Sequence, residues 1–358
     1  MLNAPDLTSS LIGHEAAQLS IADAISRRQV PGAYLLSGQR GIGKATLAWH
    51  IAATLLTQHD SEDHKENSLF SEALPVSSPP RLSFNPNDPV ISRMQQGSHP
   101  DFLWLRPVYD DKKKQFKSEI SVDQVRKIGQ FLSLTAGEKS WKVVIIDSTD
   151  IMNNAAANAL LKWLEEPPSH TVFLLIAHHA AALLPTIISR CRMITLTVPD
   201  KDAFARIVGA QLNDQEMQQL YMLTGGSPGL AQHWQRTSWM KYWNNLLEIT
   251  SAASFDVKKA TLFSATLSKD VDFPLSSVQR LFETLLLHAT KINAAFDVSS
   301  ATQHELNAYR HIAQMHSASA LQDLWKDALY VFNNAESLYL NKPHLLFNMM
   351  AKIQGASR

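Results

Sequence analysis

The first two hundred residues alternate short apolar runs with stretches of helical periodicity. Five of the runs are apolar on both faces, and they cover residues 33–36, 101–105, 142–146, 171–177 and 193–198. Doubly apolar runs of this length between helices are typical of buried parallel strands. The pattern therefore predicts an α/β domain built on a five-stranded parallel sheet with helices on its faces.

Two polar stretches interrupt this pattern. Between residues 58 and 100, Ser, Pro, Asn and charged residues dominate, and the breakers SSPP and NPNDP predict an irregular surface insertion. The run Tyr109-Asp-Asp-Lys-Lys-Lys-Gln-Phe-Lys117 favours a solvated hairpin tip over a DNA-binding patch, because short charge runs are usually exposed loops.

Beyond Pro199 the chain becomes helical in pattern. Glycine is absent between Gly229 and Gly355, and apolar residues repeat at helical spacing over residues 278–286 and 321–332. So few helix breakers predict helices throughout.

We therefore expect three domains. Residues 1–199 form a nucleotide-fold sheet domain, 200–240 a small helical lid around Gly225-Gly-Ser-Pro-Gly229, and 241–358 a helical domain that mediates oligomerisation.

Charge and cysteine usage exclude several classes of protein. Lys plus Arg (33) balances Asp plus Glu (33), so a stand-alone DNA-binding module is disfavoured. The single cysteine, Cys191, excludes an internal disulfide and a multi-cysteine zinc site, and we expect no zinc. No apolar run approaches the ~20 residues that cross a bilayer. We expect a cytoplasmic protein without membrane contact.

A glycine-rich loop follows the first predicted strand. Gly38, four residues and then Gly43-Lys44 have phosphate-loop spacing, with Gly41 between them and a helical pattern after them. Backbone N–H groups of such a loop surround a phosphate, and the lysine ammonium adds positive potential. The strand-to-helix context favours a nucleotide site over a fortuitous glycine turn.

The residues that would drive ATP hydrolysis are altered. Ala45 stands where the loop requires a Ser or Thr to bind magnesium, and Thr46 lies about 100° further around the helix. The strand over residues 142–146 leads to Asp147, a candidate magnesium ligand through water. The next residue, where a water-activating glutamate is expected, is Ser148, a poor general base. Two losses in one chemistry predict little or no turnover and disfavour an autonomous ATP-driven enzyme.

Nearby polar residues have structural interpretations. We expect Asp150 to cap the helix that follows, and Glu165-Glu166 before Pro167 to end that helix rather than to form a catalytic acid pair. For Cys191, a buried structural thiol is at least as good an interpretation as a reactive one.

Several segments resemble the bacterial clamp-loader family of AAA+ subunits, which comprises the gamma/tau and delta-prime proteins. These segments are residues 147–168, Ile187-Ile-Ser-Arg-Cys-Arg192 with its Ser-Arg-Cys triplet, Leu11-Ile-Gly-His-Glu15, Ser98-His-Pro-Asp101 and residues 120–126. The resemblance covers residues from about 10 to 230, and the tail only in general character. It implies an AAA+ P-loop sheet domain, a small helical lid and a C-terminal all-α collar.

Within this family the delta-prime type fits best, because the ATP chemistry is damaged. Gly229 lies near the position of the lid's nucleotide-sensing arginine, and Ala177 and His178 fall at a second sensing position. The resemblance implies a subunit of the DNA polymerase III holoenzyme without polymerase activity, which helps to load the sliding clamp onto primed DNA. Its partners would be the gamma/tau and delta subunits, and ATP or ADP is the candidate ligand of the degenerate site. The alternative is an active gamma/tau-type ATPase.

Arg190 falls between a helix-like run and the last predicted strand. Its planar guanidinium suits a phosphate presented by an adjoining chain, although a surface ion pair is the simpler interpretation from the residues alone. The resemblance implies a catalytic role in trans, as an arginine finger that reaches the γ-phosphate held by a neighbouring subunit.

Overall fold

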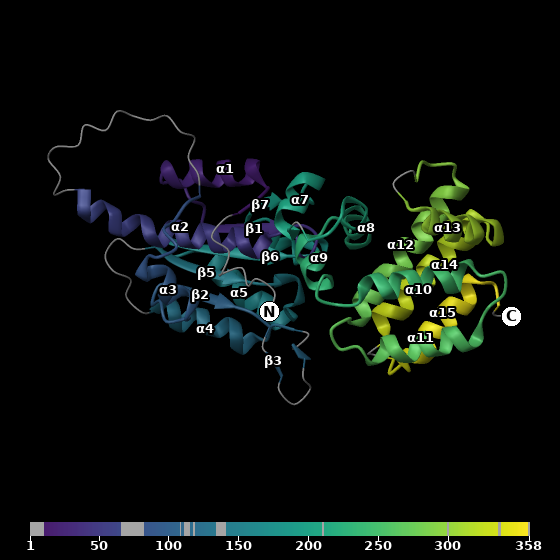
Figure 1. Cartoon of the computed structure of the whole chain (residues 1–358). Helices are drawn as coiled ribbons and strands as arrows, with labels where there is room; N and C mark the ends of the chain where they lie inside the picture. The colour runs from purple at the N-terminus through teal and green to yellow at the C-terminus, as the bar shows by residue number, and fades with distance from the viewer. Residues whose placement is uncertain are drawn as a thin grey trace. The chain divides into compact units, whose positions relative to one another are not determined.

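Figure 1 shows the computed structural model of the chain. It describes residues 11–65, 82–107, 109–110, 115–116, 119–133, 141–209, 211–298, 301–335 and 338–356. The chain divides into two compact units, Met1–Ala203 and Phe204–Arg358. A three-domain division with a boundary near residue 240 stays a prediction.

The first unit is built on the five-stranded parallel sheet that the apolar runs predict. Its strands are β1 (Ala33–Ser37), β2 (Phe102–Leu105), β5 (Lys142–Ile146), β6 (Thr171–Ala177) and β7 (Arg192–Thr195), in the order β2-β5-β6-β1-β7. All four pairings are parallel. The three inner strands β5, β6 and β1 are buried along their whole length.

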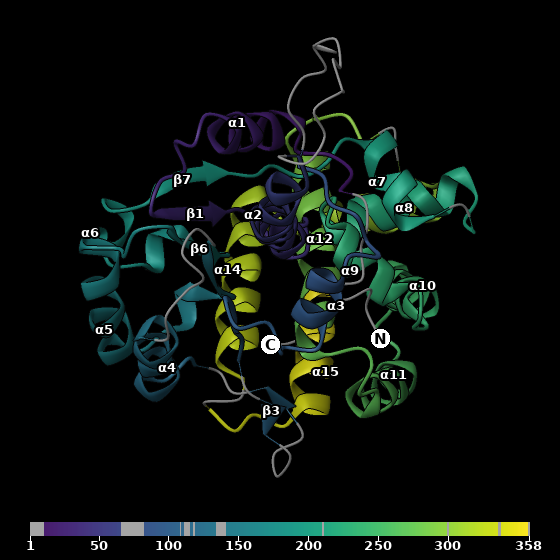
Figure 2. The ribbon, with the colours of Figure 1, turned by 90° about the vertical axis from the view of Figure 1, so that its left-hand side faces the viewer.

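Helices cover both faces of this sheet (Figure 2). One face packs against α1 (Glu15–Ser26), α2 (Lys44–Lys65) and α3 (Pro89–Gln95), and the other against α4 (Val122–Ser133), α5 (Asn154–Glu165) and α6 (Pro185–Ile188). Successive residues of a strand point to opposite faces, so Leu36 joins the first hydrophobic cluster and Leu35 the second. The doubly apolar runs of the inner strands are explained by these two cores. The expectation that the run over residues 193–198 is a buried strand is wrong, because β7 lies at the sheet edge and is mostly exposed.

The stretch expected to be irregular is partly helical. α2 continues to Lys65, and α3 begins at Pro89. The Asp88 side chain accepts a hydrogen bond from the Val90 N–H at 2.8 Å, and a proline in the first helical turn needs no N–H partner. The Asp-Pro pair is therefore a helix start and not a breaker. Residues 66–81 lie outside the described residues.

The polar run after β2 forms the predicted hairpin. β3 (Tyr109–Asp110) pairs antiparallel with β4 (Gln115–Phe116). The tip over residues 111–114 lies outside the described residues, so its DNA contact is not tested.

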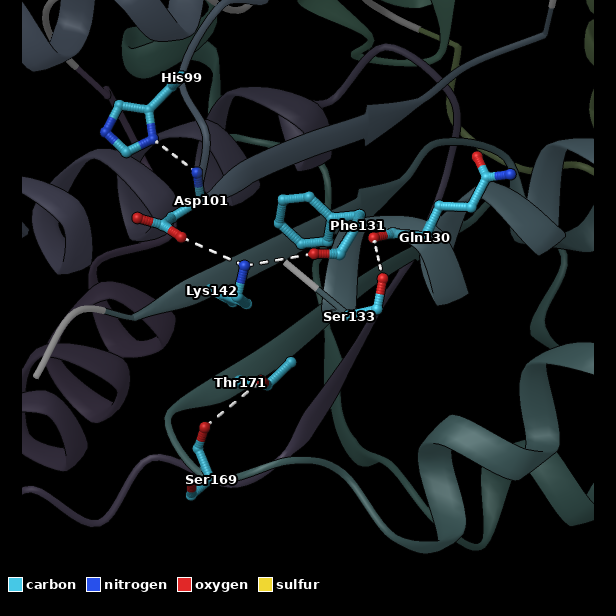
Figure 3. A network of polar contacts seen from close by, with 8 residues as sticks. All are labelled: His99, Asp101, Gln130, Phe131, Ser133, Lys142, Ser169 and Thr171. Atoms are coloured by element: carbon cyan, nitrogen blue, oxygen red, sulfur yellow. Dashed lines mark hydrogen bonds and ion pairs between the residues drawn. The ribbon is translucent and has the colours of Figure 1, made fainter. Parts of the chain in front are cut away.

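A buried ion pair ties the start of β5 to the entry of β2 and to the end of α4. Lys142 Nζ lies 3.3 Å from Asp101 Oδ1 and donates to the Phe131 carbonyl at 3.2 Å (Figure 3). His99 Nδ1 accepts the Asp101 N–H at 3.1 Å. A shift of β5 that separated Lys142 from Asp101 would leave two buried charges without partners, which costs free energy. The ion pair therefore favours one position of β5 relative to β2.

The second unit is helical. Its helices are α8 (Asp214–Thr224), α9 (Pro228–Trp234), α10 (Trp239–Ser251), α11 (Val257–Lys269), α12 (Leu275–Asn293), α13 (Gln303–Met315), α14 (Ala318–Asn334) and α15 (Lys342–Ile353), and α7 (Lys201–Val208) precedes them. In the part of the chain that the structure describes, none of the helices has the length and apolar character needed to cross a membrane.

One hydrophobic cluster extends from Phe204 through α8 and α9 to Ile353 in α15. Trp234 of α9 donates its indole N–H to Ser277 Oγ of α12 at 3.0 Å. Its ring centroid lies 5.1 Å from that of Phe273. The segment expected to form a lid therefore shares a core with the helices that follow it.

We expect a fragment that ends at Ala203 to remain folded and monodisperse. A fragment that ends at Met240 should aggregate, because it keeps α8 and α9 but exposes Trp234 and the apolar face of α8 without their partners on α12. Size-exclusion chromatography with far-ultraviolet circular dichroism checks both fragments. A monodisperse 1–240 fragment with native helix content would show that α8 and α9 need no support from α12.

Candidate functional site

β1 leads directly into the glycine-rich loop, and α2 begins at Lys44. Gly38, Gly41 and Gly43 have φ values of 143°, 78° and 104°, which side-chain-bearing residues rarely adopt. A Cβ atom on Gly38 would lie 2.4 Å from the Leu196 carbonyl oxygen. The glycine spacing thus has a steric cause, and the expected strand, loop and helix are present in order.

Lys44 lies buried against its own loop, with 3% of its surface exposed. Its Nζ donates to the carbonyl oxygens of Gly38 at 2.5 Å and of Gln39 at 2.6 Å. Burial lowers the pKa of Lys44 to about 8, although Asp150 and Asp147 oppose this shift. Below pH 8 the ammonium keeps its charge, as a phosphate-binding group requires.

His14 holds the loop from the other side. Its Nε2 lies 2.7 Å from the Ile42 carbonyl oxygen, and its backbone has the left-handed φ of 59°. A Cβ on Gly43 would lie 3.7 Å from this Nε2. In the sequence, His14 stands out only as part of a segment that resembles the clamp-loader family. Its contact with the Ile42 carbonyl depends on tertiary packing, which no local pattern encodes.

Asp147 reaches the same edge of the sheet as the loop. The carboxyl ends of β2 and β5 are paired, so Arg106 and Asp147 leave the sheet on neighbouring strands. Burial raises the pKa of Asp147, while the charges of Arg106, Arg40 and Lys44 oppose this rise. Three cationic side chains therefore act on the Asp147 carboxylate, which the sequence makes a candidate magnesium ligand.

Ser148 and Asp150 both contact the residues that follow β6. Ser148 Oγ lies 3.3 Å from His178 Nε2, and Asp150 Oδ2 accepts the backbone N–H groups of His178 and His179 at 3.1 and 3.0 Å. The expectation that Asp150 caps α5 is therefore wrong. Asn153 caps that helix, because it directly precedes the first turn and accepts the Ala156 N–H at 2.9 Å.

His178 is an uncharged imidazole at neutral pH. Burial lowers its pKa to about 4, and the nearby charge of Lys44 contributes. Its Nδ1 and the Oδ1 of Asp150 are buried without a hydrogen-bond partner among the described residues. Buried polar atoms are usually paired, so these two orphans indicate that the site is completed by a ligand or by water.

The residues present do not fit a catalytic magnesium ion. Ala45 is half-buried and packs its methyl group against the hydrophobic cluster under α2, and Thr46 is half-buried one position further on in the first turn. Magnesium prefers oxygen ligands in a near-octahedral set, and a methyl group supplies none. Within the described ranges no group of three or more His, Cys, Asp or Glu side chains could hold a metal ion.

Arg190 lies just after α6 and is engaged within its own chain. Its Nη2 pairs with Glu165 Oε1 at 2.8 Å, and its Nη1 donates to the Thr186 carbonyl at 2.9 Å. The side chain is 34% exposed. The ion pair that the residues alone favour is therefore present, and three of the five guanidinium N–H donors are left by these two contacts.

The rest of the Ser-Arg-Cys triplet packs locally. Ser189 Oγ donates to the Thr186 carbonyl at 3.2 Å. Burial raises the pKa of the Cys191 thiol to about 12, so the thiol stays protonated and unreactive at neutral pH. Cys191 is half-buried, and its structural interpretation stays a prediction.

Comparison with known proteins gives a consistent family. The family model described as DNA polymerase III, delta subunit, matches residues 13–200. The DNA polymerase III subunit delta' of Pseudomonas aeruginosa is 37% identical over 209 residues, which cover 58% of this chain and 56% of that protein. The delta' subunit of Yersinia pestis is 30% identical over 65% of this chain and 68% of that protein. The DNA polymerase III subunit tau of Bacillus subtilis is 27% identical over 52% of this chain and 28% of that protein.

The matches cover part of each relative. The chain spans about half the length of several curated delta' relatives it matches, from 40% to 56% for three of them. Among solved structures, a DNA polymerase III gamma subunit-related protein from Thermotoga maritima aligns with a TM-score of 0.42 at 18% identity, over 95% of this chain and 100% of that chain. This structural likeness is too low to support an argument. The family match spans more than half of the sequence, and the chain therefore belongs to the family described as DNA polymerase III, delta subunit.

Proposed function

We propose that the chain is a delta'-type subunit of the clamp loader of DNA polymerase III, which helps to place the sliding clamp on primed DNA. The gamma/tau and delta subunits are the partners that this role requires. The observation that carries the proposal is a phosphate loop with complete glycine geometry whose hydrolytic residues are replaced. Family membership and the delta' relatives support the same role.

The site around Ser148 supports low turnover. A general base works best when its pKa lies near the working pH, and the pKa of His178, the imidazole next to Ser148, is about 4. The Ser148 and His178 pair is therefore a weak replacement for a carboxylate that orients water. This pair favours the proposed low turnover over the alternative, an active gamma/tau-type ATPase.

Arg190 contributes to catalysis in trans under this proposal. Its ion pair with Glu165 is partly exposed on both sides, at 34% and 51%, and such pairs are worth ~0–1 kcal/mol. A doubly charged phosphate group of a neighbouring subunit would form stronger, bidentate contacts with the guanidinium. Glu165 can thus be displaced at small cost when the subunits assemble.

We expect the isolated chain to hydrolyse ATP slowly or not at all, because Ala45 supplies no magnesium ligand and no carboxylate occupies position 148. A phosphate-release assay with an active gamma/tau subunit as the positive control measures this. Turnover in the range of that control would contradict the proposal and favour the active alternative.

We expect Arg190→Ala to leave the chain folded and able to assemble but to lower the DNA- and clamp-stimulated ATPase of the reconstituted complex. One neighbouring site would be silenced, and an arginine finger is worth roughly 10³-fold at its own site where such fingers have been dissected. Arg190→Lys should rescue poorly, since lysine keeps the charge but loses the planar fork.

Arg192→Ala is the matched control for this experiment. Arg192 lies two residues further on, is exposed, and donates to Ser20 Oγ at 3.1 Å. Its loss should leave the stimulated ATPase unchanged. If the Arg190→Ala complex hydrolyses ATP at the unmodified rate, the arginine has no role in trans and the subunit acts as a scaffold.

A further inference from the structure

Two arginines, Arg106 and Arg40, act electrostatically on Asp147, the carboxylate that the sequence makes a candidate magnesium ligand. Arg106 directly follows β2, and the Asp147 N–H donates to the Leu105 carbonyl at 2.9 Å, which fixes these two strand ends together. The Arg106 guanidinium carbon lies 3.4 Å from the centroid of the Trp104 ring, so its position is held by stacking. Arg40 lies in the phosphate loop itself, between Gly38 and Gly41.

The charged side chains that act on Lys44 and Asp147 include more cations than carboxylates. The side chains that act on one another there are Arg40, Lys44, Arg106, Asp147 and Asp150. Three of them are cationic and two are carboxylates, and His178 beside them is neutral at pH 7. A magnesium ion would add two positive charges to this set, and Ala45 would offer it no oxygen ligand.

We propose that this loop binds the phosphates of ADP or ATP without a divalent cation, with Arg106 and Arg40 supplying the charge that magnesium supplies in an active ATPase. Guanidinium groups bind phosphate oxygens in a bidentate manner, and they remain charged at all physiological pH values. The Nδ1 atom of His178 has no hydrogen-bond partner among the described residues. In the neutral tautomer that carries its proton on Nδ1, this nitrogen can donate a hydrogen bond to a phosphate oxygen. The inference rests on the proposed function in one respect, that this site binds nucleotide and does not turn it over.

Such a site holds nucleotide as a structural ligand. Arginine and lysine neutralise the phosphates but generate no nucleophilic water, which a metal ion or a general base would provide. The bound nucleotide would therefore stabilise the sheet unit by mass action, by an amount that grows with the logarithm of its concentration relative to Kd.

Isothermal titration of the full-length chain with ADP tests this proposal, once in excess EDTA and once with magnesium. We expect the same Kd in both solutions. Arg106→Gln should weaken ADP binding in EDTA roughly tenfold or more, the usual effect of losing a hydrogen bond to a charged group. Arg106→Lys should bind with intermediate affinity, because it keeps the charge without the fork.

Arg126→Gln is the matched control. Arg126 is an exposed arginine on α4 that pairs with Asp123 at 3.0 Å, and its loss should leave the Kd unchanged. Thermal melts of each variant confirm that it is folded.

ADP binding that appears only with magnesium, or that magnesium strengthens tenfold, would overturn the proposal. So would an Arg106→Gln variant that binds as the unmodified chain does. If ADP binds in neither solution, the site holds no nucleotide and the inference fails. The proposed subunit role would then still stand or fall by its own test, the Arg190 variants in the assembled complex.

Discussion

The parallel direction of the strands is the constraint on which the site depends. In an open parallel sheet the carboxyl ends of all strands meet at one edge, and ligands bind outside that edge. This edge brings together the loop after β1, Arg106 after β2, Asp147 after β5 and His178 after β6, which are separated by up to 140 positions in the chain. At the amino ends the buried Lys142 and Asp101 pair holds β5 against β2 (Figure 3), so Asp147 and Arg106 keep their relation at the far end.

Patterns that depend on local sequence predicted the fold well. The strands and the phosphate loop were found because burial on two faces and glycine spacing leave a direct record in the chain. Two errors came from polar residues whose partners lie elsewhere. Asp150 satisfies backbone groups after β6 instead of the nearest helix, and Asp88 with Pro89 starts a helix where breakers were expected. An acceptor bonds to the donors that the fold brings close, and spacing alone does not show which these are.

In the helical region too, local features could be predicted from the sequence and tertiary contacts could not. Scarcity of glycine and proline predicted the helices, since propensity and periodicity are local properties. Whether α8 and α9 have a core of their own depends on which helix each apolar face meets, and the indole of Trp234 meets α12. Likewise, periodicity could place Arg190 after a helix, but only the tertiary structure shows its pairing with Glu165.

The backbone at Ser148 bears on how this site could change during evolution. Ser148 has φ 66° and ψ 53°, a left-handed conformation that costs any residue with a Cβ atom roughly 1–2 kcal/mol. A glutamate that arose there by mutation would inherit this strain, and Ala45 would still supply no magnesium ligand. Each reverting substitution alone would thus leave the set of hydrolytic residues incomplete. Under the proposed function, hydrolysis would therefore return only if several of these residues changed together.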